Sequence, residues 1–309
     1  MVEIIRALNL TPEQEALVDL HSFLNVLNIL SAEMDLLAHY IGGDDNLRAG
    51  ITTVHEFAKA LRDPFQARLW IEDIEAVHRE IRAAVDQATT GLEPTPESAE
   101  CIDNINAIMV IFKSRVRELA VRANVPLIWK WHELQTLRED LSLLFQVMAQ
   151  KSNGRFGIKD NIADQGERDY LVKFDTASHD GHQIFMPAIF TDVIRDLLAN
   201  ARKYTAPGGK VLAGLHDNGH RIRLVVEDTG IGIPEDQIQD IVTFGFRADN
   251  AQARRTYGGG FGLTKAYWVT SRLKGRMWIH SKIDVGTRVT IEFPRLTRPE
   301  PTDAPYGRA

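Results

Sequence analysis

Cysteine is nearly absent from this sequence of 309 residues, which contains a single one, Cys101. One cysteine excludes an intramolecular disulfide framework, and its scarcity agrees with a reducing compartment. Cys101 lies among Ile102, Ile105 and Ile108. In such an apolar setting we expect a buried thiol with a structural role, because a free cysteine behaves as a small hydrophobic residue.

Long apolar runs are missing as well. No stretch approaches the roughly 18 apolar residues that a membrane-spanning helix needs. The segment 1–15 contains acidic side chains early and no long apolar core, so it does not match a signal peptide. We therefore expect a cytoplasmic protein without direct membrane insertion.

A surplus of basic residues is the third absence. The sequence has 36 Lys and Arg against 42 Asp and Glu, a formal net charge of −6. Nucleic-acid-binding proteins usually carry a basic face, so this balance does not favour such a partner. Hydrophobic residues at 44% and charged residues at 25% are typical of a globular protein, and the length allows two domains.

Helical signals dominate the first half of the chain. Thr11, Pro12 and Gln14 form a helix start, with threonine as the cap, proline in the first turn and glutamine at the capping-box position. Apolar residues then recur at spacings near three and four up to Ile41, which indicates an amphipathic helix. The glycines at 42–43 end it.

Three further helical stretches follow. We expect helices over about 46–89, with a break at Pro64, over 97–123 and over 127–151. Together with the first helix they predict an antiparallel bundle of four helices, and helical hairpins with an apolar stripe usually pair into homodimers. We assign residues 1–152 to this helical domain.

The second half alternates strand-like and helical segments. Strand patterns occur at 170–174, 211–215, 222–226, 277–279 and 288–293, and helical patterns near 187–204 and 262–273. This order predicts an α/β sandwich over 153–296, a sheet covered by helices, followed by a loose tail at 297–309. The fold class of the whole chain is therefore α+β.

Four short segments of the second half combine polar residues with glycines: 196–205, 227–234, 257–263 and 284–287. On a helix, Asp196, Asn200 and Lys203 stand at positions i, i+4 and i+7 and share one face. A carboxylate there can orient a nucleophile, an amide oxygen can ligate Mg²⁺, and an ammonium group can meet phosphate. Taken singly, each segment also fits a plain role as a polar helix face, a glycine turn or a hairpin.

Glycines in two of the other segments indicate places where the backbone can contact a ligand. Asp228 ends a strand and is followed by Gly230 and Gly232, so the backbone can approach a flat ring closely. The glycines at 258–262 open a helix, where unpaired N–H groups and the helix dipole favour anions.

In this order the four segments resemble the N, G1, G2 and G3 boxes of the GHKL ATPases, over roughly 175–295. The runs Ala-Asn-Ala-Arg-Lys-Tyr-Thr at 199–205 and Asp-Thr-Gly-Ile-Gly-Ile-Pro at 228–234 are most similar to bacterial sensor histidine kinases. The resemblance implies a GHKL (Bergerat) α/β sandwich that binds ATP and Mg²⁺, preceded by a helical stem like the dimerisation and phosphotransfer domain of that family.

The resemblance also implies roles at the phosphate end of the nucleotide. Asn200 would ligate Mg²⁺, Asp196 stands where the group places a residue that assists catalysis, and Lys203 would contact phosphate. The helix-opening segment would wrap the phosphates with Gly258, Gly260, Gly262 and Leu263. The stretch 243–257 occupies the place of the mobile ATP lid.

At the adenine end, Asp228 would accept the adenine amino group. Gly230 and Gly232 would make room for the ring, Tyr204 would flank the nucleotide, and Thr287 would support the adenine through water.

A histidine kinase needs an imidazole on a helix, with one ring nitrogen neutral and free to attack. Of the ten histidines, His21 is our candidate, because His21, Asn25 and Asn28 recur at i, i+4 and i+7 beside the leucines. The setting resembles the histidine helix of the family's stem. It departs at Ser22, where the family pattern has an acid that polarises the imidazole. A plain surface histidine is the alternative.

His132 is the second candidate. Glu133 follows it directly and Thr136 comes four positions later, as in the family's histidine box. Its expected helix, however, runs toward the ATPase segment with no return helix after it. An interhelical histidine is the alternative, and the phosphoacceptor stays open between His21 and His132.

The resemblance as a whole implies a two-component sensor histidine kinase. Such an enzyme phosphorylates itself on histidine with ATP and Mg²⁺ and passes the phosphoryl group to an aspartate of a response-regulator receiver domain. Two alternatives remain: a GHKL protein kinase that acts on serine of a partner protein, and a phosphotransfer or scaffold protein that only binds ATP.

Overall fold

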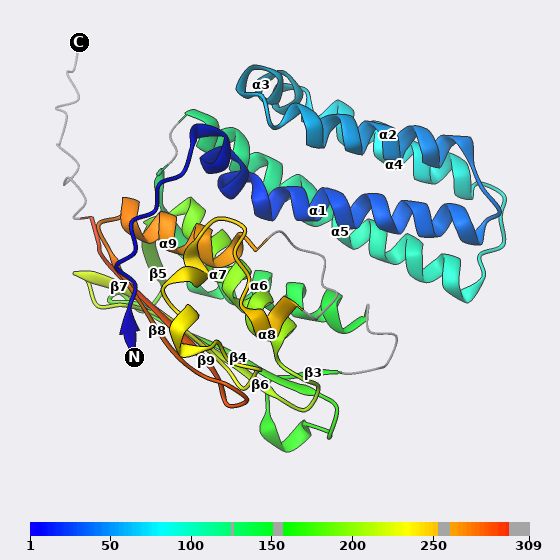
Figure 1. The fold of residues 1–309 in the computed structure, drawn as a ribbon. Coiled ribbons are helices and arrows are strands. Elements are labelled where there is room, and N and C mark those ends of the chain that lie inside the picture. Colours follow the sequence, from blue (N-terminus) through cyan, green and yellow to red (C-terminus); the bar gives the residue numbers. More distant parts are fainter. Residues whose placement is uncertain (125–126, 151–156, 253–259, 297–309) are drawn as a thin grey trace, which may run out of the picture.

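The computed structural model describes residues 1–124, 127–150, 157–252 and 260–296. Two parts pack against each other: a group of long helices, and a sheet with helices on one face (Figure 1). Each part has a core of buried apolar residues. The mixture of helices and sheet confirms the α+β class.

The long helix α1 (Pro12–Tyr40) begins where the sequence places it. Thr11 Oγ1 accepts the Gln14 N–H at 3.3 Å, and the Gln14 side chain accepts the Thr11 N–H at 3.1 Å, which completes the capping box. The apolar stripe is buried along the helix, with Leu27, Leu30 and Leu37 fully covered. The prediction of a helix over 12–41 is therefore confirmed.

Four more helices complete the helical part: α2 (Asp45–Ala60), α3 (Pro64–Glu72), α4 (Ile74–Thr89) and α5 (Pro96–Asn124). Pro64 opens α3 after Asp63 has capped it, so the expected break divides 46–89 into three helices. α1 packs on α5 and α2, and α2 packs on α4. The four long helices of one chain thereby enclose a shared core.

The fourth helix of this bundle is not the expected one. Residues 129–133 form a strand, β2 (Trp129–Glu133), and only then does α6 (Leu134–Gln150) begin. β2 pairs antiparallel with β5 (Gln183–Pro187). The prediction of one helix over 127–151 is wrong at its start, because pairing with a strand some fifty residues away decides the conformation of this segment.

The main sheet has seven strands in the order β1-β8-β9-β7-β6-β4-β3. The strands are β1 (Val2–Glu3), β3 (Ile158–Lys159), β4 (Tyr170–Ala177), β6 (Lys210–Asp217), β7 (Arg221–Asp228), β8 (Arg276–Lys282) and β9 (Gly286–Pro294). β3, β4 and β6 run parallel, and the other neighbours are antiparallel. All five predicted strands are present, and β1, β2, β3 and β5 were not foreseen.

Helices α6, α7 (Ala188–Tyr204) and α9 (Gly262–Arg272) cover one face of this sheet (Figure 1). In β6 and β7 buried and exposed positions alternate, as expected for a sheet with one covered face. The short helices η1 (Ile162–Asp164), η2 (Glu235–Gln237), η3 (Asp240–Val242) and α8 (Asp249–Gln252) lie in the connections.

The two hydrophobic cores do not divide the chain at the predicted boundary, residue 152. β1, β2 and α6 precede that position, yet β1 pairs with β8, β2 pairs with β5, and α6 packs against β4. Val18 of α1 also belongs to the core of the sheet-bearing part. The assignment of 1–152 and 153–296 to two domains stays a prediction, and the tail at 297–309 lies outside the described residues.

None of the helices described is both long enough and apolar enough to span a bilayer.

The helical core depends on an aromatic cluster. Phe57 of α2 contacts Phe23 of α1 and Phe112 of α5 edge to face, at centroid distances of 5.8 and 6.0 Å. All three rings are buried.

We expect Phe57→Ala to lower the free energy of unfolding by about 3–5 kcal/mol, because it leaves a cavity. Phe65→Ala on α3, where the ring is 69% exposed, is the matched control and should change it by less than about 0.5 kcal/mol. Urea unfolding followed by circular dichroism measures both; equal effects would contradict this picture of the core.

Candidate functional site

One cavity lies where α7, α9, the β7–β9 region of the sheet and α1 meet. Most of the residues singled out in the sequence line it: His21, Asp196, Asn200, Lys203, Tyr204, Asp228, Gly232, Gly260, Gly262, Leu263 and Thr287. Gly230 stands directly behind this lining, and Gly258 lies outside the described residues. Segments from both halves of the chain thus converge on one cleft.

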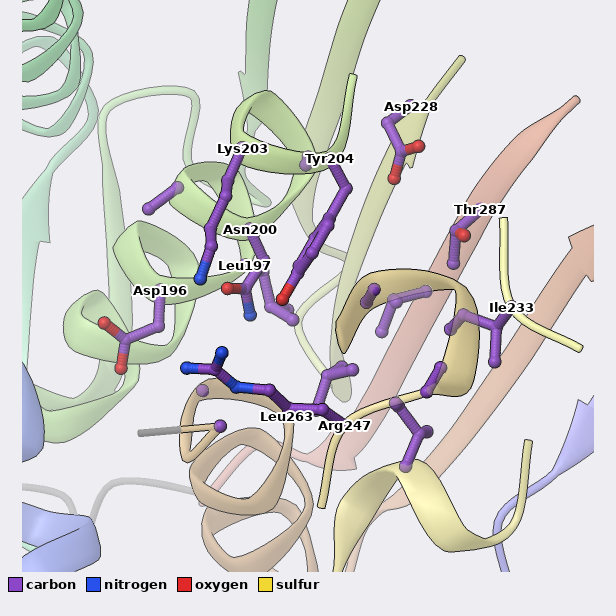
Figure 2. Close-up of a pocket in the computed structure, with 18 of the residues that line it drawn as sticks. Asp196, Leu197, Asn200, Lys203, Tyr204, Asp228, Ile233, Arg247, Leu263 and Thr287 are labelled. Carbon is purple, nitrogen blue, oxygen red and sulfur yellow. The ribbon is translucent and has the colours of Figure 1, made fainter. Parts of the chain in front are cut away.

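Helix α7 carries the polar wall of the cavity. Figure 2 shows Asp196, Asn200 and Lys203 on successive turns, as the i, i+4, i+7 spacing predicted. The polar ends of Asn200 and Lys203 point into the cleft, and the carboxylate of Asp196 lies at its edge. Arg247, which precedes α8, reaches toward them from the opposite side (Figure 2). Three nitrogen-bearing side chains and a carboxylate therefore surround this end of the cavity.

The environment of Lys203 disfavours its charged form. Burial, together with the positive charges of Arg247 and Arg202, lowers the pKa of Lys203 to about 8. Its Nζ also lies 5.2 Å from the centroid of the Tyr204 ring. Two cations held close together in a partly desolvated cleft favour an anion between them.

Asp228 marks the opposite end of the cavity, beside Thr287 (Figure 2). Burial raises the pKa of Asp228 to about 6, although the N–H groups of Gly230 and Thr287 hydrogen-bond to its carboxylate and oppose the shift. The distance from the Gly230 nitrogen to Asp228 Oδ1 is 2.8 Å. The carboxylate is thereby fixed in place while remaining poorly solvated.

Thr287 is held by the neighbouring strand. Its hydroxyl lies 2.8 Å from Ser281 Oγ, and Ser281 Oγ accepts the N–H of Ile233 at 2.8 Å. These bonds connect the β8–β9 hairpin to the glycine turn that follows Asp228. The second and fourth predicted segments therefore form one wall.

Two glycines of that turn are required because neighbouring backbone atoms leave no room for a side chain. A Cβ on Gly230 would lie 2.6 Å from the carbonyl oxygen of Tyr204, and a Cβ on Gly232, whose φ is +69°, would collide with the carbonyl oxygen of Lys282. No side chain can be accommodated at either position. The glycines hold the turn against the end of α7 and the β8–β9 hairpin, a role that the local sequence pattern does not reveal.

The start of α9 approaches Asn200 in the same way. A Cβ on Gly262 would lie 2.6 Å from Asn200 Nδ2, so only glycine lets the amide side chain occupy this place. Gly260 has a φ of +76°, which also favours glycine. The helix-opening segment and the amide of α7 are thus built as one unit.

His21 of α1 lies at the edge of this cavity. Its ring meets Phe261 edge to face at 5.1 Å between centroids, and Asn25 Nδ2 lies 3.2 Å from His21 Nε2. Burial lowers the pKa of His21; the carboxylate of Asp196 opposes this, and the ammonium of Lys265 adds to it. The lowered pKa favours the neutral form of the imidazole. Asn25 lines the cavity beside it.

His132 is in a different environment. It lies on β2, where it pairs with Ile184, and it does not line the cavity. Burial lowers its pKa to about 4, and within the described part of the chain its Nε2 has no hydrogen-bond partner. The expectation that it sits on a helix is wrong, and the structure makes it a buried strand residue.

Phe246 and Arg247, which also line the cavity, belong to the stretch 243–257 expected to form the ATP lid. Phe261, Ile233 and Ile241 line it as well and were not assigned a role. Phe261 lies inside the glycine-rich segment 257–263, so its position next to the cavity could have been predicted from that segment. Ile233 likewise stands inside the segment 227–234, whereas Ile241 lies outside all four segments and has no local signal of this kind.

Mg²⁺ can be tested against the side chains that are present. In the described ranges no group of three or more His, Cys, Asp or Glu side chains could hold a metal ion. Asn200 offers one amide oxygen to the cavity. Mg²⁺ often takes one or two protein oxygens and completes its shell with water and substrate phosphates, so the donor set fits such an ion.

Comparisons with known proteins find similarity over part of the chain. Residues 187–297 match the family described as histidine kinase-, DNA gyrase B-, and HSP90-like ATPase. The sensor histidine kinase RppB from Synechocystis sp. is 34% identical over 107 residues, which are 35% of this chain and 24% of RppB. The adaptive-response sensory kinase SasA from Synechococcus elongatus is 32% identical over 123 residues, 37% of this chain and 31% of SasA.

The chain therefore spans less than a third of the length of either relative. Among solved structures, the catalytic domain of the histidine kinase ThkA superposes with a TM-score of 0.40 at 19% identity, covering 54% of this chain and 98% of that domain.

The raised pKa of Asp228 predicts a pH-dependent stability. A folded pKa of about 6, above the ordinary value of 3.8, gives a contribution that is complete below pH ~4 and is lost as the pH rises through about 6. Asp228→Asn keeps the acceptor for Gly230 and removes the charge. We expect it to raise the free energy of unfolding without nucleotide by about 1–3 kcal/mol at pH 7.5 and by nearly nothing below pH ~4. Urea unfolding from pH 4 to 8 tests this, and a gain that did not vary with pH would refute the assignment.

Proposed function

We propose, from the match of residues 187–297 to the histidine kinase-, DNA gyrase B-, and HSP90-like ATPase family, that the chain is a two-component histidine kinase. It transfers the γ-phosphoryl group of ATP to His21 and then passes it to an aspartate of a response-regulator receiver domain. The partial matches to RppB and SasA, which are named as a sensor histidine kinase and a sensory kinase, support this proposal.

The observation that carries the proposal is the shared cavity. His21, from the first helix of the chain, lines the same cleft as Asn200, Lys203 and Asp228, from the matched segment. A nucleophile and the groups that would bind the phosphoryl donor must lie within one enclosed site for transfer to occur. His132 does not meet this condition.

The nucleotide would lie along the cavity. Asp228 would accept the adenine amino group, with Thr287 beside it, and Tyr204 and Ile233 would flank the base. Lys203 and Arg247 would contact the triphosphate, together with backbone N–H groups at the start of α9. Mg²⁺, held through Asn200 and the phosphates, would neutralise charge that develops during transfer. Gly258, by resemblance, would join the phosphate-binding segment.

His21 would attack as a neutral imidazole. A bond forms between its unprotonated ring nitrogen and the γ-phosphorus, and the bond from that phosphorus to the ADP oxygen breaks. The imidazole gains positive charge in this step, and the carboxylate of Asp196, which already favours the charged form of the ring, would stabilise it. We infer that Asp196 takes the role for which the family uses an acid beside the histidine, at the position of Ser22.

Three parts of the expectation stay predictions: the homodimer, the cytoplasmic location and the receiver-domain partner.

The proposal predicts which variants retain label from γ-labelled ATP with Mg²⁺. The unmodified protein and His132→Ala should incorporate label, whereas His21→Ala and Asn200→Ala should lose about 100-fold or more, because the nucleophile or the metal ligand is gone. The product should be labile in acid and stable in alkali, as expected for a phosphohistidine. Autoradiography after acid and alkaline washes, with thermal unfolding of each variant as a control, gives the result.

Label kept in His21→Ala and lost in His132→Ala would overturn the choice of acceptor. Acid-stable label would instead favour a kinase that acts on hydroxyl groups. Magnesium-dependent ATP binding without any label would leave a protein that only binds nucleotide.

A further inference from the structure

A lysine is fully buried at the junction of the two parts. Lys265 of α9 is 0% exposed, and within the described residues it is the one lysine in the buried class. Burying an ammonium group is unfavourable unless charged and hydrogen-bonding partners compensate it closely. The groups that compensate the charge of Lys265 therefore indicate its role.

Its partners come from two other helices. Lys265 Nζ lies 3.4 Å from Asp192 Oδ2 and 3.9 Å from Asp196 Oδ2 on α7. It also donates to the main-chain oxygen of Asp19 on α1 at 3.2 Å. Asp19 precedes the candidate phosphoacceptor by two positions. One buried cation thus ties α7, α9 and the start of α1 together.

The same face of α9 continues this junction. Trp268 Nε1 donates to Glu15 of α1 at 3.2 Å, and the Arg272 guanidinium pairs with the same carboxylate at 3.1 Å. Positions 265, 268 and 272 follow at i, i+3 and i+7, so they form one ridge along α9. The ridge meets Asp19 and Glu15, which stand one turn apart on α1.

Apolar packing completes the contact. Val18 is fully buried in the core of the sheet-bearing part, whereas Phe23 is buried in the core of the helical part. His21 lies between them. Its orientation toward the cavity is therefore fixed by how α1 docks on α9.

We propose that Lys265 is a positioning residue: by docking the amino-terminal turns of α1 on α7 and α9, it holds His21 in the nucleotide cavity of its own chain. This rests on the function proposed above. His21 lines the cavity formed by its own chain, so the transfer expected here is from the ATP bound in that same cavity. Lys265 itself need not touch the nucleotide.

Lys265→Met tests the docking role, because it keeps most of the volume and removes the charge; Asp192 retains its pairing with Arg195 at 3.2 Å. We expect kcat for autophosphorylation to fall by about 10-fold or more while the Kd for Mg·ATP changes by less than about 3-fold. Lys173→Met, at an exposed position of β4, is the matched control and should keep both values. Glu15→Gln weakens the same junction at its exposed end and serves as a second variant if Lys265→Met does not fold.

A readout that needs no activity separates this inference from the proposed function. Diethyl pyrocarbonate modifies accessible imidazoles, and mass spectrometry reports its rate at His21. We expect that rate to rise by about 3-fold or more in Lys265→Met, because undocking exposes the ring. Unmodified protein without label would refute the proposed function alone. Unchanged kcat and unchanged His21 modification in Lys265→Met, or a parallel loss of ATP binding, would refute the positioning role.

The own-chain transfer has its own test. His21→Ala retains a nucleotide site and lacks the acceptor, whereas Asn200→Ala retains the acceptor and lacks the metal ligand. We expect no label on Asn200→Ala when it is mixed with His21→Ala at equal concentration, with the two chains distinguished by a size tag. Label on the Asn200→Ala chain would show transfer between chains and would overturn this part of the inference.

Discussion

Helix α1 belongs to two hydrophobic cores at once, and the candidate site depends on that constraint. Val18 is buried with the sheet-bearing part and Phe23 with the helical part. A helix is stiff over so short a distance, so these two burial requirements fix both its rotation and its position along its axis. His21 is presented to the cavity by this packing, with Phe261 and Asn25 as its direct neighbours. A change in the packing of the distal helices could therefore act on the site through α1 without altering any residue that lines it.

The cavity shifts its ionisable groups in a consistent way. Burial raises the pKa of Asp228 to about 6, lowers that of Lys203 to about 8 and lowers that of His21. Each shift favours the neutral form, because the charged form has lost solvent that the protein only partly replaces. A bound triphosphate would compensate the positive charge of Lys203, and an adenine amino group would donate a hydrogen bond to the carboxylate of Asp228. For His21 the shift itself is useful, since a neutral imidazole is the nucleophilic form. Perturbed groups gathered in one cleft are the physical mark of a binding site.

Local patterns in the sequence predicted most of the elements and the polar wall of the cavity. The leucine stripe of α1, its capping box and the spacing of Asp196, Asn200 and Lys203 depend on residues close together in the chain, so periodicity reveals them. β2 was missed because its conformation depends on pairing with β5. The requirement for glycine at 232 comes from the backbone of Lys282, and the burial of Lys265 comes from Asp19 and Asp192. Contacts between such distant segments leave no trace in local spacing, and none of them could be read from composition.

The arrangement of α1, α2, α4 and α5 changes what a second copy of the chain would have to bind. In a bundle that is completed by dimerisation, each chain supplies two helices and the partner buries their apolar stripes. Here the stripe of α1 is already covered by α2 and α5, with Leu27, Leu30 and Leu37 fully buried within one chain. A homodimer would therefore have to use outward-facing side chains, such as Ile29, Leu36 and Tyr40 of α1, which are 41–44% exposed. Because that surface lies apart from both cores, the site could be assembled in a single chain, and pairing would add an interface without being needed to place His21.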